Sequence, residues 1–98
     1  MIILESGVYA ILDERTHQMY IGSAKCIKSR VAYHRSQLKR GKHYNIGLQE
    51  AFFARHPLRY IPLIQYDRYD KKAIASVERQ LIQAFRTQDP RYGFNVYN

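Results

Sequence analysis

The sequence predicts an α/β domain, an α+β sandwich in which a small mixed or antiparallel β-sheet is flanked by helices. Two observations predict it. Short runs rich in Tyr, Ile and Val are interspersed with longer segments of helical periodicity, and turn residues separate them. The element order is β-β-α-α-β-α-β. The chain has 98 residues, 46% of them hydrophobic, so residues 1–98 are expected to form a single domain around a small core.

The first two strands form a predicted hairpin. Residues 7–12 and 19–22 are strand-like, and the polar residues 13–18 between them are expected to turn. Tyr9 lies in the first strand and Tyr20 in the second. Tyrosines in strands mostly pack with a polar edge, so a functional role requires a partner that orients the hydroxyl or lowers its pKa.

Three helices are expected, each with a capping residue at its start. Ser23, Asn45 and Asp70 can each accept a hydrogen bond from the first turn of the helix that follows. Gly41 can end the first helix, and Pro57 stops the second. The helices are expected to cover residues 24–40, 46–55 and 71–86.

The remaining strands are predicted in the second half of the chain. Residues 59–66 are rich in Tyr and Ile, and Pro62 within them favours an edge position or a bulge. Residues 94–97 could form a short last strand.

The charge of the chain favours a polyanionic partner. Sixteen Lys and Arg oppose eight Asp and Glu, which gives a net charge of +8. Simple solubility is the alternative, but solvated helices usually mix both signs. No acidic residue occurs between residues 25 and 42, where the basic residues are Lys25, Lys28, Arg30, Arg35, Lys39, Arg40 and Lys42. This distribution favours nucleic acid over solubility alone, and the helix lacks the broad apolar face of a membrane-surface binder.

Composition also excludes several classes of protein. A hydrophobic content of 46% argues against disorder, and no apolar run is long enough for a membrane span or a signal peptide. Cys26 is the only cysteine, so an internal disulfide framework is impossible and a zinc finger is disfavoured. A reducing, cytoplasmic setting is therefore expected.

Polar side chains occupy apolar helix faces at two places. Glu78 falls between Ile74 and Ile82 on the third helix, and His34, with Arg30 at the margin, falls on the apolar face of the first. The simpler interpretation of Glu78 is a structural ion pair or a side chain bent out to water. The simpler interpretation of His34 is a core histidine with its hydrogen bonds satisfied. Together, however, an Arg for phosphate, a His for proton transfer and a Glu for a divalent metal suit phosphodiester chemistry.

Several motifs, in order, resemble those of the GIY-YIG nucleases. Gly7-Val8-Tyr9 and Tyr20-Ile21-Gly22 resemble the two signature tripeptides, although valine replaces isoleucine in the first. The likeness covers residues 7–96 and is greatest with the homing-endonuclease branch. It continues through Ser23-Ala24-Lys25, Arg30, His34, Gly41-Lys42-His43, Leu48-Gln49, Glu78 and Gly93-Phe94-Asn95.

This resemblance implies a hydrolase, a metal-dependent endonuclease that cleaves phosphodiester bonds in DNA. Glu78 would hold one divalent ion, Mg²⁺ or Mn²⁺, and Arg30 would contact the scissile phosphate. Tyr9 or His34 would activate the water, and the choice between them stays open at this point. Tyr20 and His34 would orient water and phosphate, and Asn95 would hold the site together by hydrogen bonds.

The remaining basic residues would contact the nucleic-acid backbone. His43 could contact substrate or lie on the surface of a loop. A non-catalytic nucleic-acid-binding module on a degenerate nuclease fold is the alternative function. The sequence leaves the substrate open between single-stranded, duplex or branched DNA and RNA. It also leaves open whether the protein is a monomer or a homodimer, and whether a partner supplies specificity. A prokaryotic or phage-type cytoplasmic setting is expected.

Overall fold

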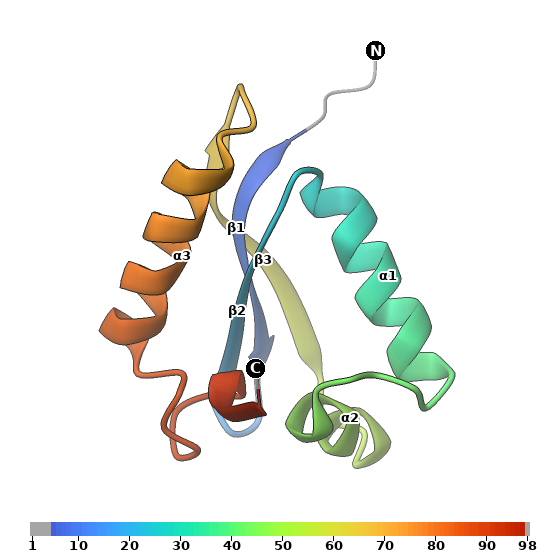
Figure 1. Cartoon of the computed structure of the whole chain (residues 1–98). Coiled ribbons are helices and arrows are strands. Elements are labelled where there is room, and N and C mark those ends of the chain that lie inside the picture. Colours follow the sequence, from blue (N-terminus) through green and yellow to red (C-terminus); the bar gives the residue numbers. More distant parts are fainter. Residues whose placement is uncertain (1–4, 98) are drawn as a thin grey trace.

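A three-stranded antiparallel sheet forms the centre of the molecule, in the order β2-β1-β3 (Figure 1). The computed structural model describes residues 5–97. β1 spans Ser6–Asp13, β2 spans Met19–Ala24 and β3 spans Leu58–Tyr66. β1, the central strand, is buried along almost its whole length because helices cover both faces of the sheet. The predicted hairpin and the third strand are therefore confirmed.

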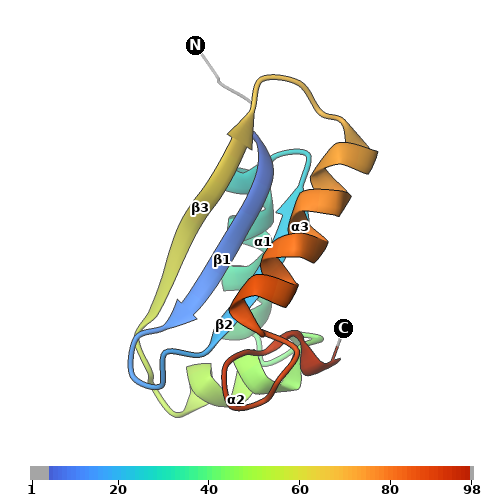
Figure 2. The same cartoon turned by 90° about the vertical axis from the view of Figure 1, so that its left-hand side faces the viewer.

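Helices cover both faces of this sheet. α1 (Ile27–Lys39) and α2 (Ile46–Phe53) lie on one face, and α3 (Lys71–Phe85) lies on the other (Figures 1 and 2). Alternate β1 side chains point to opposite faces. Tyr9 and Ile11 pack in the core beneath α1 and α2, whereas Val8 and Ala10 pack against α3. The predicted α+β sandwich is confirmed. No helix within residues 5–97 is long and apolar enough to cross a membrane.

Pro62 lies where the sequence predicts it, on an edge strand and at a bulge. β3 has no strand on its outer side. Val8 pairs with Ile64 and Tyr9 with Pro62, so Leu63 is the extra residue of the bulge. The two strands approach closely here, because a Cβ on Gly7 would lie 1.9 Å from the Ile64 carbonyl oxygen.

The helix starts confirm two of the three predicted caps. The side chains of Asn45 and Asp70 accept hydrogen bonds from the backbone N–H groups of Leu48 and Ala73. The Ser23 cap is wrong. β2 continues through Ser23 to Ala24, which pairs with Gly7, so α1 starts only after Cys26.

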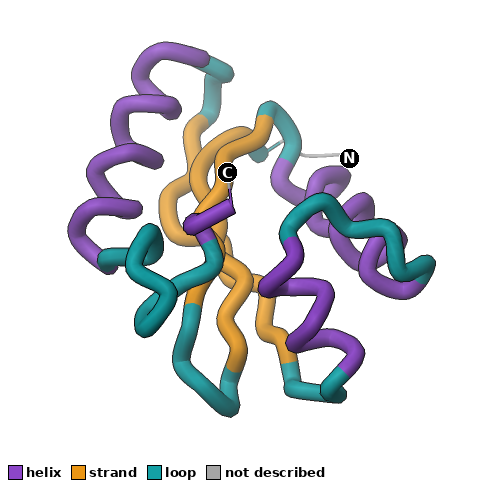
Figure 3. The backbone as a smooth tube through the Cα atoms, turned by 60° about the horizontal axis from the view of Figure 1, so that its bottom comes forward, coloured by secondary structure: helices purple, strands orange, loops and turns teal. Residues whose placement is uncertain are grey.

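The predicted strand at residues 94–97 is also wrong. The described chain here forms an isolated parallel bridge between Met19 and Gly93, followed by a 3-10 helix, Asn95–Tyr97. The Asn95 side chain replaces the missing strand. Its oxygen accepts from the Ile21 N–H at 2.8 Å, and its amide donates to the Ile21 carbonyl at 2.9 Å. Figure 3 shows this C-terminal segment beside the sheet.

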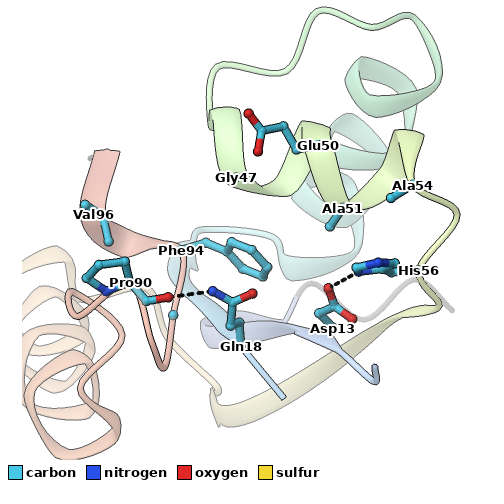
Figure 4. Close-up of a pocket in the computed structure, with 11 residues that line it drawn as sticks. Asp13, Gln18, Gly47, Glu50, Ala51, Ala54, His56, Pro90, Phe94 and Val96 are labelled. Carbon is cyan, nitrogen blue, oxygen red and sulfur yellow. Dashed lines mark hydrogen bonds and ion pairs between the residues drawn. The ribbon is translucent and has the colours of Figure 1, made fainter. Parts of the chain in front are cut away.

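At the end of β1, a buried carboxylate orders the turn into β2. Asp13 is fully buried and accepts hydrogen bonds from the backbone N–H groups of Arg15 and Thr16 and from Nδ1 of His56 at 2.7 Å. Figure 4 shows Asp13 and His56 in the wall of a pocket of about 330 Å³, opposite Glu50. Burial raises the pKa of Asp13, but the hydrogen bonds outweigh it and leave this pKa below 3.8.

Asp13→Asn should destabilise the fold near neutral pH by about 1–3 kcal/mol, because it breaks the charge-assisted hydrogen bond from His56. The folded-state pKa is lowered, so the carboxylate contributes stability above pH 3.8 that is lost as the pH falls through the folded value. Urea unfolding of the wild type and the variant at pH 7 and pH 2.5 checks this. The free energies of unfolding of the two proteins should differ less at pH 2.5 than at pH 7. An equal difference at both pH values would contradict the stabilising role of the Asp13 carboxylate.

Candidate active site

The centre of the candidate site is Tyr9, which lies beneath α1 and is 2% exposed. Gly22 of β2 faces Tyr9 across the strand pair. A Cβ on Gly22 would lie 2.6 Å from the Tyr9 hydroxyl oxygen, which is closer than side-chain carbons approach. Gly22 is therefore required for the Tyr9 ring to lie flat across β2, and this links the two signature tripeptides physically.

A chain of hydrogen bonds runs from Tyr9 through two histidines. The Tyr9 hydroxyl lies 2.6 Å from Nε2 of His34, and Nδ1 of His34 lies 2.7 Å from Nε2 of His43. The backbone N–H of Asn45 donates to Nδ1 of His43 at 3.0 Å. His34 is fully buried and His43 is 7% exposed.

The backbone N–H of Asn45 sets the direction of this chain, because it can only donate. Neutral His43 must then carry its proton on Nε2, which donates to Nδ1 of His34. His34 in turn carries its proton on Nε2, which donates to the Tyr9 oxygen. His34 therefore has no free lone pair, and the hydroxyl hydrogen of Tyr9 is directed away from it.

Burial keeps both histidines neutral. Burial, followed by the neighbouring His43 and Arg30, lowers the pKa of His34 from 6.5 to about 4, and burial also lowers the pKa of His43. The pKa of Tyr9 is raised, first by burial and then by Tyr44, while the positive charge of Arg30 opposes the shift.

The folded protein should lose stability as the pH falls from 6.5 towards 4. In this range the unfolded chain protonates His34, whereas the folded chain does not until about pH 4, so protons favour unfolding. The free energy of unfolding, measured in urea at half-unit steps, should drop by about 1–3 kcal/mol across this window. His34→Gln should flatten the profile between pH 6.5 and 4. A wild-type free energy of unfolding that stays constant between pH 6.5 and 4 would contradict the neutral state of His34 and His43.

Stacked rings extend the site outward from His34. The His43 ring stacks on His34, with centroids 4.9 Å apart, and the Tyr44 ring stacks on His43 at 4.6 Å. The Tyr44 hydroxyl lies 2.7 Å from the hydroxyl of Tyr20. The pKa of Tyr20 is raised by burial, with Tyr44 adding to the shift. Tyr20 is therefore fixed at the edge of the same cluster as Tyr9.

Arg30 lies at the mouth of this cluster. It is exposed, one helical turn before His34, and its charge acts on both Tyr9 and His34. It lines a pocket of about 460 Å³ together with Lys25, Tyr33 and Tyr44. An anion that enters this pocket meets the guanidinium whose charge also acts on Tyr9.

Glu78 lies on α3, across the sheet from α1. It is half-buried, and its negative charge raises the pKa of both Tyr9 and Tyr20. Among residues 5–97 it makes no hydrogen bond or ion pair; the described ion pairs are His56–Asp13 and Arg91–Asp89. The structural ion pair considered for Glu78 is therefore not found within the described chain, and the carboxylate is available to a cation.

A family model decides which class of protein this site belongs to. Residues 5–92 match the model of the GIY-YIG catalytic domain. The chain belongs to the GIY-YIG family. The resemblance of its motifs to this family is thus confirmed, as is the prediction of a nuclease-type enzyme.

Individual GIY-YIG proteins agree with this assignment. The chain is 27% identical over 93 residues to Intron-associated endonuclease 1 of Enterobacteria phage T4, across 95% of this chain and 37% of that protein. It therefore spans little more than a third of that curated relative.

Two solved GIY-YIG structures have the same fold. The catalytic domain of intron endonuclease I-TevI, in a mutant form, has a TM-score of 0.84 and 26% identity, covering 95% of this chain and 94% of that one. The catalytic domain of homing endonuclease I-TevI has a TM-score of 0.81 and 27% identity, covering 90% and 96%.

Within this GIY-YIG domain, the predicted catalytic residues separate into three groups. Tyr9, Tyr20, Arg30 and His34 gather on the α1 face, whereas Glu78 acts from the α3 face. The Asn95 side chain is hydrogen-bonded to the backbone of Ile21 in β2, and its own N–H donates to the Thr87 carbonyl, so it ties the C-terminal segment to the Tyr-Ile-Gly strand. The predicted nucleic-acid contacts are all exposed except His43: Lys25, Lys28, Arg35, Lys39, Arg40 and Lys42.

His43 is not the loop surface residue that the sequence also allowed, because it is 7% exposed and hydrogen-bonded to His34. The sequence prediction missed Tyr44 and Asn45. The sequence predicts Asn45 only as a helix cap, and no spacing rule indicates that its backbone N–H also orients His43. An aromatic residue next to a histidine, in a basic stretch, was the only available indication for Tyr44.

Proposed function

We propose that this GIY-YIG domain is an endonuclease that hydrolyses phosphodiester bonds in DNA. The observation that carries the proposal is the hydrogen-bonded chain Tyr9–His34–His43, with the exposed guanidinium of Arg30 near enough for its charge to act on Tyr9 and His34. A buried hydroxyl of fixed orientation beside an exposed cation suits attack of water on a phosphate. The relatives named as endonucleases support the same reaction.

Arg30 binds the scissile phosphate. Its permanent charge and planar fork match the phosphate oxygens, where negative charge increases in the transition state. Lys25 adds a second positive charge in the same pocket. The other exposed basic residues of α1 contact the backbone farther along and contribute affinity rather than rate.

Tyr9, not His34, accepts the proton of the attacking water. Both nitrogens of His34 are engaged: Nδ1 accepts from His43, and Nε2 donates to Tyr9. Reversing the chain would direct a proton of His43 at the Asn45 N–H, which cannot accept one. For this role the Tyr9 hydroxyl first releases its own proton to solvent, and the Nε2–H of His34 is directed to stabilise the resulting phenolate. The phenolate then takes the proton of the attacking water and becomes a neutral hydroxyl again.

Glu78 holds the divalent cation on which GIY-YIG nucleases generally depend. No group of three or more His, Cys, Asp and Glu side chains comes together among residues 5–97, so Glu78 would be a single carboxylate ligand at this site. Mg²⁺ suits such a site, since it retains several of its waters, and Mn²⁺ is the alternative ion. When bound, the ion supplies positive charge for the phosphate and the leaving oxygen.

The setting proposed for this activity is the cytoplasm of a prokaryotic or phage-infected cell. The phage relative and the single cysteine support it.

Glu78→Gln should reduce cleavage by roughly 100-fold or more while leaving DNA affinity equal or higher, because a negative charge near the phosphate is removed. Labelled single-stranded and duplex oligonucleotides, with Mg²⁺ and with EDTA, provide the assay. Glu50→Gln, an exposed carboxylate on α2, is the matched control and should cleave normally. Cleavage that survives EDTA would contradict the metal role. Salt-sensitive binding without cleavage by the wild type would favour a non-catalytic binding module.

A further inference from the structure

The pocket beside Arg30 has a lining that phosphate recognition alone does not require. Of the described residues that line its 460 Å³, two are cationic, Lys25 and Arg30, and none is a carboxylate. Two others are tyrosines with large exposed fractions, 48% for Tyr33 and 51% for Tyr44. Aromatic surface and positive charge thus meet in one hollow next to the candidate catalytic tyrosine.

Tyr44 is the outer end of a column of rings. His34 is fully buried, His43 is 7% exposed and Tyr44 is 51% exposed, so the column leads from the core to the solvent. The interplanar angle is 24° at both steps, and the ring centroids lie 4.9 and 4.6 Å apart. His43 covers one face of Tyr44, and the exposed area of the ring is therefore on its other side.

The Tyr44 ring is also fixed in orientation. Its hydroxyl is hydrogen-bonded to Tyr20 at 2.7 Å, and its inner face rests on His43, so both of its side-chain torsions are restrained. Stacking on a preorganised ring loses little conformational entropy. Tyr33 adds a second aromatic surface from α1, edge-on to His34 at 6.4 Å.

We infer that this pocket receives one unstacked base of the cleaved strand, which stacks on the outer face of Tyr44 while Arg30 holds the adjoining phosphate. The inference rests on the proposed nuclease function and defines its substrate class. The preferred substrate is DNA in which a base at the cleaved position is unpaired or easily unpaired. Every base has a flat aromatic face, so this contact selects for an accessible base rather than for a sequence.

A double-mutant cycle between protein and DNA tests the contact. Cleavage by the wild type first locates the cut on a labelled oligonucleotide. The nucleotides on either side of the cut are then replaced, one at a time, by an abasic residue. Dissociation constants are measured by fluorescence anisotropy with the full chain carrying Glu78→Gln, with and without Tyr44→Leu. Tyr92→Leu is the control, because Tyr92 is a similarly exposed tyrosine outside the pocket.

At one position, Tyr44→Leu should weaken binding of the intact oligonucleotide by roughly 5- to 150-fold and leave binding of its abasic counterpart unchanged. Tyr44→Phe should retain the distinction, and Tyr92→Leu should leave it unaltered. Any general disturbance of the site by Tyr44→Leu would affect both oligonucleotides alike and cancel in the cycle. Equal weakening of both at every position, with wild-type cleavage intact, would overturn the base pocket. An absence of wild-type cleavage on any substrate would instead overturn the nuclease function.

Discussion

Tyr9→Phe is expected to slow DNA cleavage by roughly 100- to 10,000-fold, the usual contribution of a positioned general base. Phenylalanine fills the same space beneath α1 and is compatible with Gly22, so the fold should persist. The substitution leaves the Nε2–H of buried His34 without its acceptor, which costs about 1–3 kcal/mol of stability. Single-turnover cleavage and urea unfolding of the same preparation separate the two effects.

The pH dependence of cleavage distinguishes Tyr9 from His34 as the base. A base with the pKa of His34, about 4, would be fully deprotonated at neutral pH, and the rate would be flat above it. Tyr9 has a raised pKa, so the rate should continue to rise through pH 9. Tyr66→Phe, in β3 on the opposite face, should behave as the wild type. Full activity of Tyr9→Phe, together with loss in His34→Gln, would reverse the assignment.

Arg30→Ala is expected to lower the cleavage rate by roughly 100- to 1000-fold, because it removes a charge aimed at the developing negative charge on phosphate. DNA affinity should fall by only a few fold, since the basic surface of α1 supplies many other contacts. Single-turnover rates at saturating protein, and dissociation constants in EDTA, measure the two quantities separately.

Lys28→Ala is the matched control for Arg30→Ala. Lys28 is an exposed cation on the same helix, outside the pocket of Arg30. The Lys28→Ala variant should reduce DNA affinity and the salt dependence of binding without lowering the cleavage rate of the bound complex. An Arg30 variant that only binds more weakly would reduce Arg30 to a positioning contact.

Much of the fold could be predicted because its elements are locally encoded. The apolar strand-like run at residues 7–12, the apolar stripe of α3 and the caps at Asn45 and Asp70 are short-range patterns, and the structure confirms them. The prediction of a last strand is wrong because Phe94 and Val96 have strand-like character, whereas the Asn95 side chain makes the hydrogen bonds that a strand would have made. The prediction of a helix cap at Ser23 is wrong because Ser23 pairs with Val8 as part of β2.

The site was predictable where one helix carries it and unpredictable where three segments meet. Arg30 and His34 share a face of α1, and helical spacing alone indicates them. The direction of the Tyr9–His34–His43 chain depends on contacts between residues 9, 34, 43 and 45 that no local pattern encodes. Glu78 was correctly identified as polar on an apolar face, but its location across the sheet from Arg30 required the strand order.

The Asn95 side chain has a consequence for self-association. Together with the bridge at Met19, it uses the backbone groups that the edge of β2 would otherwise present at Met19 and Ile21. At the opposite edge, Pro62 has no N–H to offer, and the bulge beside it breaks the regular spacing of β3. Neither edge strand, β2 or β3, is therefore suited to pair with a strand of a second molecule. Two copies that meet on one DNA would have to do so through side-chain contacts and not by merging their sheets into one.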